Sequence, residues 1–421
     1  MTSLTIAYVG MTHLGLISAV GAAEKGFNVV CFDPDKHQIE LLKAKKLSIV
    51  EPSLPQLLEK NLERLHFTCN PIDLNLCDLV YIAPDVPTNE LGQSDFTKIH
   101  ELIDLVSNFL NKESFLIILS QVSPGFTRKL VWPKSQLFYQ VETLIFGQAI
   151  ERTLNPERFI LGASEPSRPV PIKLSIFLQA FDCPIFPMRY ESAELSKIAI
   201  NMFLVSSITT TNTIAELCEK IGANWSEILP SLQLDKRIGK HAYLAPGLGI
   251  AGGNLERDMA TFCSLADLHG TDAGVVRAWK YNANHRCDWV LEKIHECILP
   301  RKKCPIFAIL GLSYKKNTAS IKNSPSLALI SCLRDFTIQA FDPAVKSLPD
   351  CYSAIQSVNS SVEAYQGADV LIIMTPWDEF RNLSPHDLAK ALNEKTVIDP
   401  YGVMDESTCI SAGLNYHRLG V

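Results

Sequence analysis

The feature of this sequence that most restricts its fold is an alternation of short apolar runs with helical stretches. Residues 4–9 form an apolar run, residues 13–25 follow with a helical pattern, and residues 28–33 form a second apolar run. Apolar runs of this length, separated by helices, are typical of parallel strands joined by crossover helices. We therefore expect a strand–helix–strand unit at the start of the chain.

The same alternation continues along the chain and returns near its end. Further apolar runs occupy residues 79–83, 115–119, 306–312, 338–342, 370–374 and 396–399. Between the two alternating parts lies a stretch, residues 191–220, that contains neither Gly nor Pro and favours one long helix. The predicted fold class is α/β, with two Rossmann-like, doubly wound parallel-sheet lobes joined by this long central helix.

The length of 421 residues is too great for a single hydrophobic core. We predict a dinucleotide-binding domain over residues 1–190, a central helical domain over 191–297, and a smaller α/β domain over 298–421. Residues 246–253 are rich in glycine and should form a loop that approaches a ligand closely. The tripeptide Phe-Asp-Pro ends the second expected strand of both lobes, at Asp33 and Asp342, which hints at two related nucleotide-binding halves.

Composition excludes several classes of function. The net charge is −6 and no stripe of Lys and Arg interleaves with aromatic residues, so a nucleic-acid partner is not expected. The N-terminus lacks the pattern of a signal peptide and no apolar run approaches a membrane span, so we expect a cytoplasmic protein without a membrane partner. The 12 cysteines are scattered without a C-x-x-C pair or clustered His, so neither a disulfide frame nor a metal site is expected.

A glycine loop lies between the first expected strand and the first expected helix. Gly10 and Gly15 match the outer glycines of a G-x-G-x-x-G loop, which would place a pyrophosphate at the N-terminus of the helix, while Thr12 replaces the middle glycine. Asp33 closes the next strand, where it would accept hydrogen bonds from ribose hydroxyls and favour NAD over NADP. The alternative is that the glycines only make a tight turn and Asp33 only caps a strand.

Eight short motifs are distributed along the chain. They are YVGMTHLGL (8–16), APDVPTNELGQSD (83–95), SQVSPGFT (120–127), ELSKIAIN (194–201), RIG (237–239), PGLGIAGGNLERD (246–258), GLSYKKNTASIKNSP (311–325) and TPWDEF (375–380). In this order the chain, from residue 4 to about 402, resembles the UDP-glucose/GDP-mannose dehydrogenase family. The resemblance implies oxidation of a sugar C6 alcohol to a carboxylate with two NAD, through an aldehyde and a cysteine-bound thioester.

The resemblance also assigns roles to residues around the reaction. Lys197 and Asn201 match the lysine and asparagine that stabilise oxyanion charge at C6, and they lie four residues apart on one helix face. Asp258 matches the aspartate that handles the proton and a bound water. Asn254 stands at the position of the nucleophilic cysteine, and an amide cannot form a thioester.

Other positions depart from the family pattern. Phe146 aligns with the glutamate that helps water hydrolyse the thioester, and Gln121 replaces the threonine of the third motif. Cys263, the nearest downstream cysteine, is expected to be a core residue and not a substitute nucleophile. His13 and His241 flank the glycine loops, and we expect both to be solvated or structurally hydrogen-bonded.

Binding residues are implied in the same way. Arg237 matches an arginine that reaches sugar hydroxyls across a dimer interface, Gly252 belongs to the loop that faces the substrate, and Lys315 matches a lysine near the diphosphate. Lys322 is expected to bind the cofactor. Without the surrounding motifs, Arg237 and Lys315 would be interpreted as ordinary surface charges. A homodimer built on the central helical region is also implied.

These residues predict an NAD-dependent oxidoreductase that acts on a CH–OH group of a nucleotide sugar, with a UDP-sugar favoured. Asn254 and Phe146 remove the thioester stage, while Lys197, Asn201 and Asp258 retain what an alcohol-to-aldehyde step needs. A two-electron enzyme is therefore the leading hypothesis. Two alternatives remain, a noncatalytic relative that binds nucleotide sugar and a conventional four-electron dehydrogenase with an unrecognised nucleophile.

Overall fold

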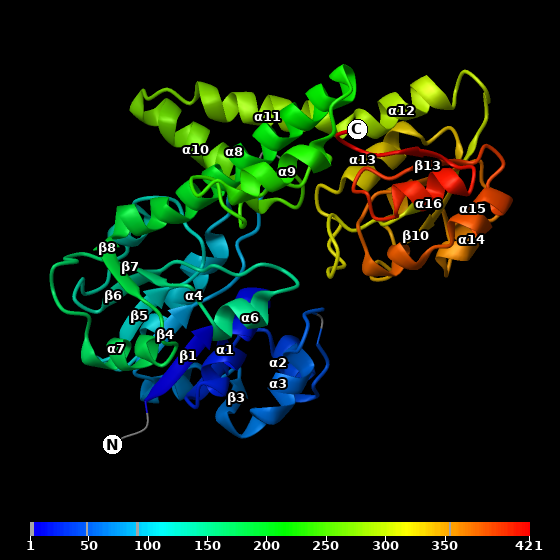
Figure 1. Cartoon of the computed structure of the whole chain (residues 1–421). Coiled ribbons are helices and arrows are strands. Elements are labelled where there is room, and N and C mark those ends of the chain that lie inside the picture. The colour runs from blue at the N-terminus through cyan, green and yellow to red at the C-terminus, as the bar shows by residue number, and fades with distance from the viewer. Residues whose placement is uncertain (1–3, 48, 90–91, 353–354) are drawn as a thin grey trace. The chain divides into compact units, whose positions relative to one another are not determined.

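The computed structural model describes residues 4–47, 49–89, 92–352 and 355–421. The backbone separates into two compact units, Met1–Ile200 and Asn201–Val421. Each unit contains one sheet, of eight strands in the first and six in the second (Figure 1).

The sheet of the first unit has the strand order β3-β2-β1-β4-β5-β6-β7-β8. Its strands are β1 (Thr5–Val9), β2 (Asn28–Phe32), β3 (Leu65–Thr68), β4 (Leu79–Ile82), β5 (Phe115–Ile118), β6 (Leu137–Gln140), β7 (Phe159–Ala163) and β8 (Ile185–Arg189). The first six strands form a parallel, doubly wound arrangement that places ligands at the carboxyl ends of the strands. The pair β6–β7 is antiparallel, and the other described strand pairs of this sheet are parallel, as in many doubly wound folds.

Central strands of this sheet are apolar on both faces because helices cover both. On β1, Ile6 and Tyr8 join one core cluster while Ala7 and Val9 join the other, as alternate residues of a strand must. The helices are α1 (His13–Glu24), α2 (Lys36–Lys43), α3 (Leu54–Lys60), α4 (Thr97–Ser107), α5 (Phe126–Lys129), α6 (Ala149–Leu154) and α7 (Ile172–Gln179), with 3-10 turns η1 (Leu62–Arg64) and η2 (Pro71–Leu76). Helix α1 is buried from His13 to Ala23, so its small and apolar residues are needed on every side.

The long helix expected over residues 191–220 is α8 (Tyr190–Ile221), which has 32 residues and extends about 48 Å. It begins in the first unit and ends in the second. Residues 198–215 contain no charged side chain, and α8 is long and apolar enough to cross a membrane by length and composition. The expectation that no apolar run approaches such a span is therefore wrong for α8. Of its most apolar window, 44% is buried within the protein, and a core helix passes the same test.

The second unit combines helices with a parallel sheet of order β11-β10-β9-β12-β13-β14. Its strands are β9 (Ile306–Leu310), β10 (Thr337–Phe341), β11 (Gln356–Ser357), β12 (Val370–Ile373), β13 (Thr396–Ile398) and β14 (Asn415–His417). Its helices after α8 are α9 (Trp225–Leu234), α10 (Asn254–His269), α11 (Gly274–Cys287), α12 (Trp289–Cys297), α13 (Pro325–Cys332), α14 (Ser361–Tyr365), α15 (Pro385–Ala391) and α16 (Glu406–Ser411), with 3-10 turns η3 (Asp350–Tyr352) and η4 (Asp378–Asn382).

The six strands of the second sheet follow the order of the first six strands of the first sheet. The predicted fold class is thereby confirmed, with two α/β lobes joined by α8. Helices α9 to α12 belong to the same compact unit as the second sheet. The division into three domains at residues 190 and 297 stays a prediction.

Candidate active site

The predicted dinucleotide loop is a tight turn between β1 and α1 that requires glycine at both ends. Gly10 has φ of 97°, and a Cβ there would lie 2.9 Å from the backbone nitrogen of Pro84. A Cβ on Gly15 would lie 1.9 Å from the carbonyl oxygen of Gly10. Because neither position has room for a side chain, the close packing of the turn itself requires both glycines.

Asp33 lies directly after β2 and is only 6% exposed. Its Oδ2 accepts a hydrogen bond from the backbone N–H of Met11 at 2.7 Å, and its Oδ1 accepts one from the N–H of Asp35 at 3.0 Å. The carboxylate thus ties the glycine loop to the end of the neighbouring strand. Each oxygen has a further lone pair, so the residue fits the predicted ribose contact of NAD as well as a structural role.

Thr12 is the N-cap residue of α1, and its hydroxyl does not cap that helix. Instead Thr12 Oγ1 accepts a hydrogen bond from the N–H of Asp85 at 2.8 Å, while Asp85 Oδ2 accepts one from the N–H of His13 at 2.9 Å. Asp85 belongs to the motif at 83–95, of which residues 90 and 91 lie outside the described residues. No local pattern in the sequence marks Asp85, because only the fold brings the loop after β4 next to the loop after β1.

His13 belongs to a buried cluster beneath the same loop. Its Nε2 lies 3.2 Å from Oε2 of Glu51, whose carboxylate also accepts hydrogen bonds from the N–H groups of Gly147 at 3.0 Å and Ala149 at 2.6 Å. The ring of Phe146 packs on the imidazole, with 4.3 Å between ring centroids. His13 is therefore structurally hydrogen-bonded, and Phe146 forms part of this packing.

Lys197 forms an ion pair in the first unit with a residue that the sequence analysis missed. Its Nζ lies 2.9 Å from Oε1 of Glu142, and the two side chains are 12% and 15% exposed. Glu142 follows β6, so it stands at the carboxyl end of the strands, where doubly wound folds place their ligands. An acidic residue just after an apolar strand was the available signal.

Asn201 and Asp258 meet in the second unit. The Nδ2 of Asn201 donates to Oδ2 of Asp258 at 2.5 Å, and Nε of Arg257 donates to Oδ1 of Asp258 at 3.1 Å. Asn201 is 6% exposed and Asp258 is 1% exposed. Two predicted catalytic residues are thus brought together as a buried charge-assisted hydrogen bond. Lys197 lies one turn earlier on α8, within the first unit.

Asn254 is the first residue of α10 and is exposed. Gly252 and Gly253 precede it with φ of 100° and 143°. A Cβ on Gly252 would lie 2.8 Å from the Tyr314 ring, and one on Gly253 would lie 3.1 Å from Cε of Lys322. The glycines therefore let the loop lie directly against the segment that carries Lys322.

Lys315, a predicted diphosphate-binding residue, follows Tyr314 after β9. Its Nζ lies 5.6 Å from the centroid of the Tyr314 ring, within the range of a cation–π contact. Gly252, Lys315 and Lys322 thus gather around one segment of the second unit, residues 311–325. Arg237 is not part of this group. Its side chain is 89% exposed and forms an ion pair with Asp235 at 2.6 Å.

All twelve cysteines are free, and one of them contacts the glycine-rich loop. Sγ of Cys287 donates to the carbonyl oxygen of Leu248 at 3.3 Å, and burial raises the pKa of this thiol to about 11. Cys263 lies on α10 and is partly buried. Cys263 is near Asn254 in sequence, whereas Cys287 reaches the glycine-rich loop from α11.

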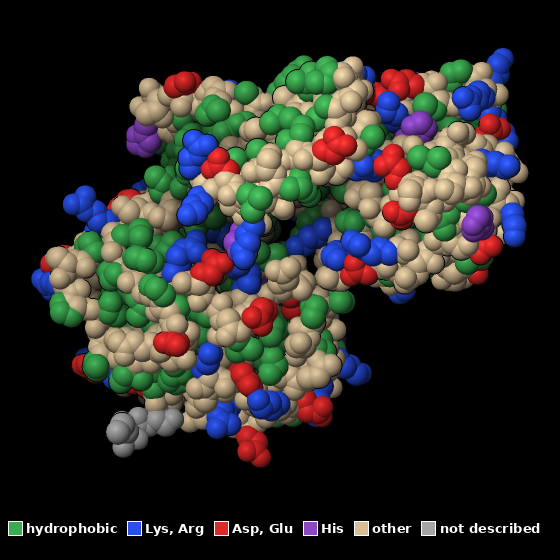
Figure 2. Space-filling view, viewed as in Figure 1, with side chains coloured by type: hydrophobic (Ala, Val, Ile, Leu, Met, Phe, Trp, Pro, Cys, Tyr) green, Lys and Arg blue, Asp and Glu red, His purple; other side chains and the backbone are tan. Residues whose placement is uncertain are grey.

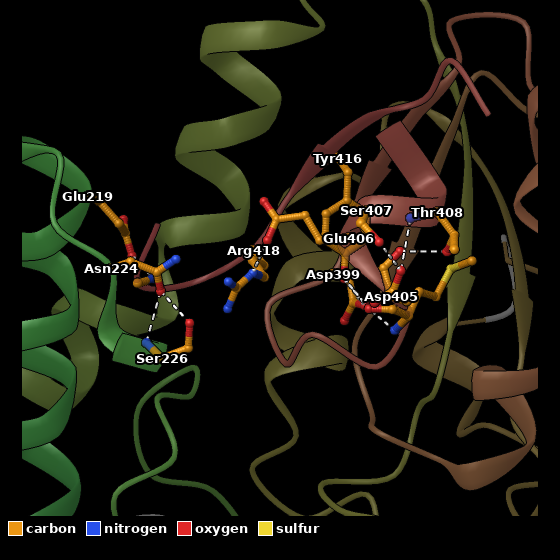
Figure 3. A network of polar contacts seen from close by, with 12 residues as sticks. Glu219, Asn224, Ser226, Asp399, Asp405, Glu406, Ser407, Thr408, Tyr416 and Arg418 are labelled. Carbon is orange, nitrogen blue, oxygen red and sulfur yellow. Dashed lines mark hydrogen bonds and ion pairs between the residues drawn. The ribbon is translucent and has the colours of Figure 1, made fainter. Parts of the chain in front are cut away.

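The segment after β13 is held by Asp399, which is fully buried (Figure 3). Its Oδ2 accepts hydrogen bonds from the N–H of Met404 at 2.9 Å and from the Tyr416 hydroxyl at 2.7 Å, and burial raises its pKa. Arg418 reaches this segment from the end of β14, where its side chain lies beside Gly402 and pairs with Glu406 at 2.7 Å.

Within the part of the chain that the structure describes, no three His, Cys, Asp or Glu side chains lie close enough together to hold a metal ion.

Comparison with known proteins finds one family along three stretches of the chain. Models of the UDP-glucose/GDP-mannose dehydrogenase family match residues 4–176 (NAD binding domain), 191–284 (central domain) and 308–406 (UDP binding domain). A UDP-glucose 6-dehydrogenase of Rickettsia conorii is 30% identical, with 99% of each chain covered. The UDP-glucose 6-dehydrogenase TuaD of Bacillus subtilis is 29% identical over 99% of this chain and 93% of its own.

Solved structures show the same fold. The structure of a UDP-glucose dehydrogenase from the archaeon Pyrobaculum islandicum is 24% identical, with a TM-score of 0.85 and coverage of 99% of this chain and 97% of that one. The family models together match well over half of the chain. The chain therefore belongs to the UDP-glucose/GDP-mannose dehydrogenase family of NAD-dependent nucleotide-sugar dehydrogenases.

Proposed function

We propose that this protein oxidises a CH–OH group of a UDP-sugar to the aldehyde with NAD, in a two-electron reaction that does not proceed to the acid. The observation that carries this proposal is the buried hydrogen bond between Asn201 and Asp258. Asp258 lies on α10, four residues after Asn254, the first residue of that helix. The groups for an alcohol-to-aldehyde step are present. The group at the family's cysteine position is an amide.

NAD, when bound, supplies the acceptor for the hydride that leaves the carbinol carbon. Gly10 and Gly15 allow its pyrophosphate to approach the start of α1, Asp33 fits its ribose, and Lys322 is proposed as a further cofactor contact. In the substrate, the alcohol loses a proton from oxygen as carbon loses the hydride. Lys197 and the Asn201 amide stabilise the negative charge that develops on that oxygen.

Asp258 orients the Asn201 amide and receives the proton of the alcohol, directly or through a water. Arg257 keeps the carboxylate in place from the other side, at 3.1 Å. Glu142 does the same for Lys197, because an ion pair at 2.9 Å fixes the direction of the ammonium. Each oxyanion-stabilising residue is thus held by a partner within its own unit.

The second oxidation requires a thiolate that forms a thioester, and we propose that this chain has lost it. Asn254 at the cysteine position has no nucleophilic sulfur. Cys287 contacts the neighbouring loop, but a thiol with a pKa of about 11 is protonated at neutral pH and already donates to Leu248. Phe146, at the position of the hydrolytic glutamate, packs on His13 and offers no base.

The UDP-sugar assignment rests on the match of residues 308–406 to a UDP binding domain and on the names of the relatives. We propose that Lys315 contacts the diphosphate and that the backbone at Gly252 faces the sugar. Arg237 is proposed to reach sugar hydroxyls of the partner subunit, which its exposure permits. The corresponding domains would be residues 1–190, 191–297 and 298–421, in a cytoplasmic protein.

A homodimer is proposed through the helices of the second unit. Phe203, Leu217 and Ile221 of α8 are 77%, 55% and 67% exposed, and Tyr281 of α11 is 76% exposed. Figure 2 shows hydrophobic side chains at the surface of this helical segment. Apolar patches of this kind mark protein interfaces. Light scattering during gel filtration should give twice the mass of 46.7 kDa, and a monomer at micromolar concentration would contradict the proposal.

The test of the proposed reaction is product stoichiometry. The protein is incubated with NAD and UDP-glucose, UDP-N-acetylmannosamine or GDP-mannose, NADH is followed by absorbance, and aldehyde is trapped with a hydrazine for mass spectrometry. One NADH for each trapped aldehyde supports the two-electron enzyme. Two NADH with a uronic acid would show that Asn254 does not prevent the second oxidation, and would favour the conventional four-electron reaction.

The noncatalytic alternative is favoured by one observation. Thr12 and Asp85 contact each other and His13 where the pyrophosphate of NAD is expected. UDP-sugar binding by calorimetry without any NADH formation would support this alternative.

A further inference from the structure

We propose that Asp85 is an affinity-determining residue of the cofactor site, whose carboxylate occupies the place of the NAD pyrophosphate and must be displaced when NAD binds. The inference rests on the cofactor site proposed above. The Asp85 carboxylate would compete with the pyrophosphate of NAD for the same backbone donor.

Two hydrogen bonds, one to Thr12 and one from His13, hold Asp85 at the start of α1. The backbone N–H of Asp85 donates to Thr12 Oγ1 at 2.8 Å, and its carboxylate accepts from the N–H of His13 at 2.9 Å. His13 is the first residue of α1, so this N–H is one of the donors that a helix leaves without an intrahelical acceptor. Such donors, together with the helix dipole, attract phosphate groups.

The neighbouring donors of the loop are also engaged. The N–H of Gly10 donates to the Phe32 carbonyl oxygen at 2.9 Å, and the N–H of Met11 donates to Asp33 at 2.7 Å. The N–H of His13 is one of the remaining donors at the start of α1 that could bind a phosphate, and Asp85 already takes it. A carboxylate in this place both fills the donor and repels a diphosphate.

The packing around Asp85 indicates that only its side chain needs to move. Pro84, the residue before it, lies close enough to the glycine turn that a Cβ on Gly10 would meet it at 2.9 Å. Ser120 Oγ also donates to the Pro84 carbonyl oxygen at 2.5 Å. The backbone before Asp85 is thus fixed against the dinucleotide loop, whereas the Asp85 side chain is exposed. NAD can displace the carboxylate by a rotation of that side chain.

Thr12 also holds Asp85 in place, through the hydrogen bond that its hydroxyl accepts. The middle position of the glycine loop here carries a hydroxyl, and that hydroxyl accepts the bond that aligns Asp85. Removing the hydroxyl should loosen Asp85, and keeping it should not. Thr12→Val and Thr12→Ser therefore form a matched pair, since Val has the shape of Thr without the acceptor and Ser retains the acceptor.

The experiment measures the Kd of NAD by calorimetry for the full-length protein and its variants. Asp85→Asn and Asp85→Ala should each bind NAD about tenfold more tightly than the natural chain, as expected for removal of a charged competitor at a helix N-terminus. Thr12→Val should shift the Kd in the same direction and Thr12→Ser should not. Asp104→Asn, an exposed carboxylate on α4, controls for the general loss of one negative charge.

The result that overturns the inference is unchanged or weaker NAD binding in both Asp85 variants. Asp33→Ala separates this failure from failure of the cofactor site. If Asp33→Ala weakens binding while the Asp85 variants match the natural chain, the site is right and the competition is wrong. If Asp33→Ala is also without effect, the cofactor site itself is wrong, and the inference falls with it. Binding of NAD only after substitution of Asp85 would support the inference most strongly.

Discussion

Asp33 and Asp342 occupy the same position in the two sheets, each after the second strand of its lobe and each bonded to the glycine turn of that lobe. Asp33 Oδ2 accepts from the N–H of Met11 at 2.7 Å, and Asp342 Oδ2 accepts from the N–H of Leu312 at 2.7 Å. The turns themselves match, since Gly10 has φ of 97° and Gly311 has φ of 96°. The repeated Phe-Asp-Pro tripeptide therefore marks the same hydrogen bond, from the glycine turn to an aspartate, in both lobes.

Asp342 should contribute strongly to the stability of the second unit. It is 3% exposed, and its Oδ2 accepts hydrogen bonds from the Ser313 N–H at 3.0 Å and from the Trp377 Nε1 at 3.2 Å as well. Asp342→Ala leaves these buried donors without an acceptor, so we expect a loss of about 3 kcal/mol in urea unfolding. Asp342→Asn, which keeps one acceptor oxygen, should lose less. Equal stability of the alanine variant and the natural chain would contradict this role.

Lys197 should be needed for turnover. If its ammonium stabilises the developing oxyanion, Lys197→Ala should lower kcat about 100-fold or more, because interactions made in the transition state are lost. Glu142→Gln should also lower kcat, since the ammonium loses its ion pair at 2.9 Å. Lys98→Ala, on the exposed face of α4, is the control and should retain full activity. Intact turnover in Lys197→Ala would show that the oxyanion assignment is wrong.

If Asn254 and Phe146 stand where the nucleophile and the hydrolytic base are required, as we propose, introducing those two groups should change the product. Asn254→Cys alone should form a covalent sugar adduct, detected by intact-protein mass spectrometry, because a thiol is present without the hydrolytic base. Asn254→Cys with Phe146→Glu should release uronic acid. The substitution of Phe146 replaces a ring that packs on His13 and adds a carboxylate near Glu51, so the thermal stability of Phe146→Glu must be measured alongside. A stable double variant that releases no uronic acid would show that other losses also prevent the second oxidation.

The sequence was sufficient to predict the two lobes and α8, because these depend on strong local patterns. It did not identify β3, β6, β7, β8, β11 and β14, of which two are weak in pattern. β8 contains Pro187 at a sheet edge, where the missing N–H is tolerated, and β11 has only two residues. Such strands form because the neighbouring strand offers an edge, which no local signal records. The limits of α8 were close, at 191–220 against Tyr190–Ile221.

For the candidate site, sequence motifs identified some residues and only the folded structure identified others. The motifs identified Asn201 and Asp258, and the structure brings them together at 2.5 Å. Glu142, Asp85 and Cys287 were missed, since each reaches the site from a loop or helix distant in sequence. Asp85 contacts the loop after β1, Glu142 pairs with Lys197 of α8, and Cys287 contacts Leu248, and only the folded chain brings these residues together.

His285 gives a pH-dependent contact on the surface of the second unit. Its hydrogen bond to Glu216 at 2.8 Å raises the pKa of the imidazole above its ordinary value. A raised pKa means that the stabilisation is present below the unfolded pKa and is lost as pH rises through the folded pKa. Both groups are partly exposed, so the contribution is below about 1 kcal/mol. NMR titration should show the raised pKa of His285, and Glu216→Gln should return it toward the ordinary value.

Glu219, one turn further along α8, should behave very differently because its partners are buried. Its carboxylate accepts hydrogen bonds from Arg286, from Trp289 Nε1 at 2.9 Å and from the backbone N–H of Gly420 at 2.8 Å. The Glu219 and Arg286 side chains are 8% and 3% exposed. Figure 3 labels Glu219 among the polar contacts of the second unit.

Removing one member of a buried ion pair leaves the other charge without compensation, which costs about 3–5 kcal/mol. We therefore expect Glu219→Ala to lower the free energy of unfolding by about this amount, measured by urea denaturation with tryptophan fluorescence. Glu216→Ala, which removes the exposed partner of His285 on the same helix, is the matched control and should change stability by less than about 1 kcal/mol. A similar small effect for both variants would mean that Glu219 does not hold the chain end and α11 against α8.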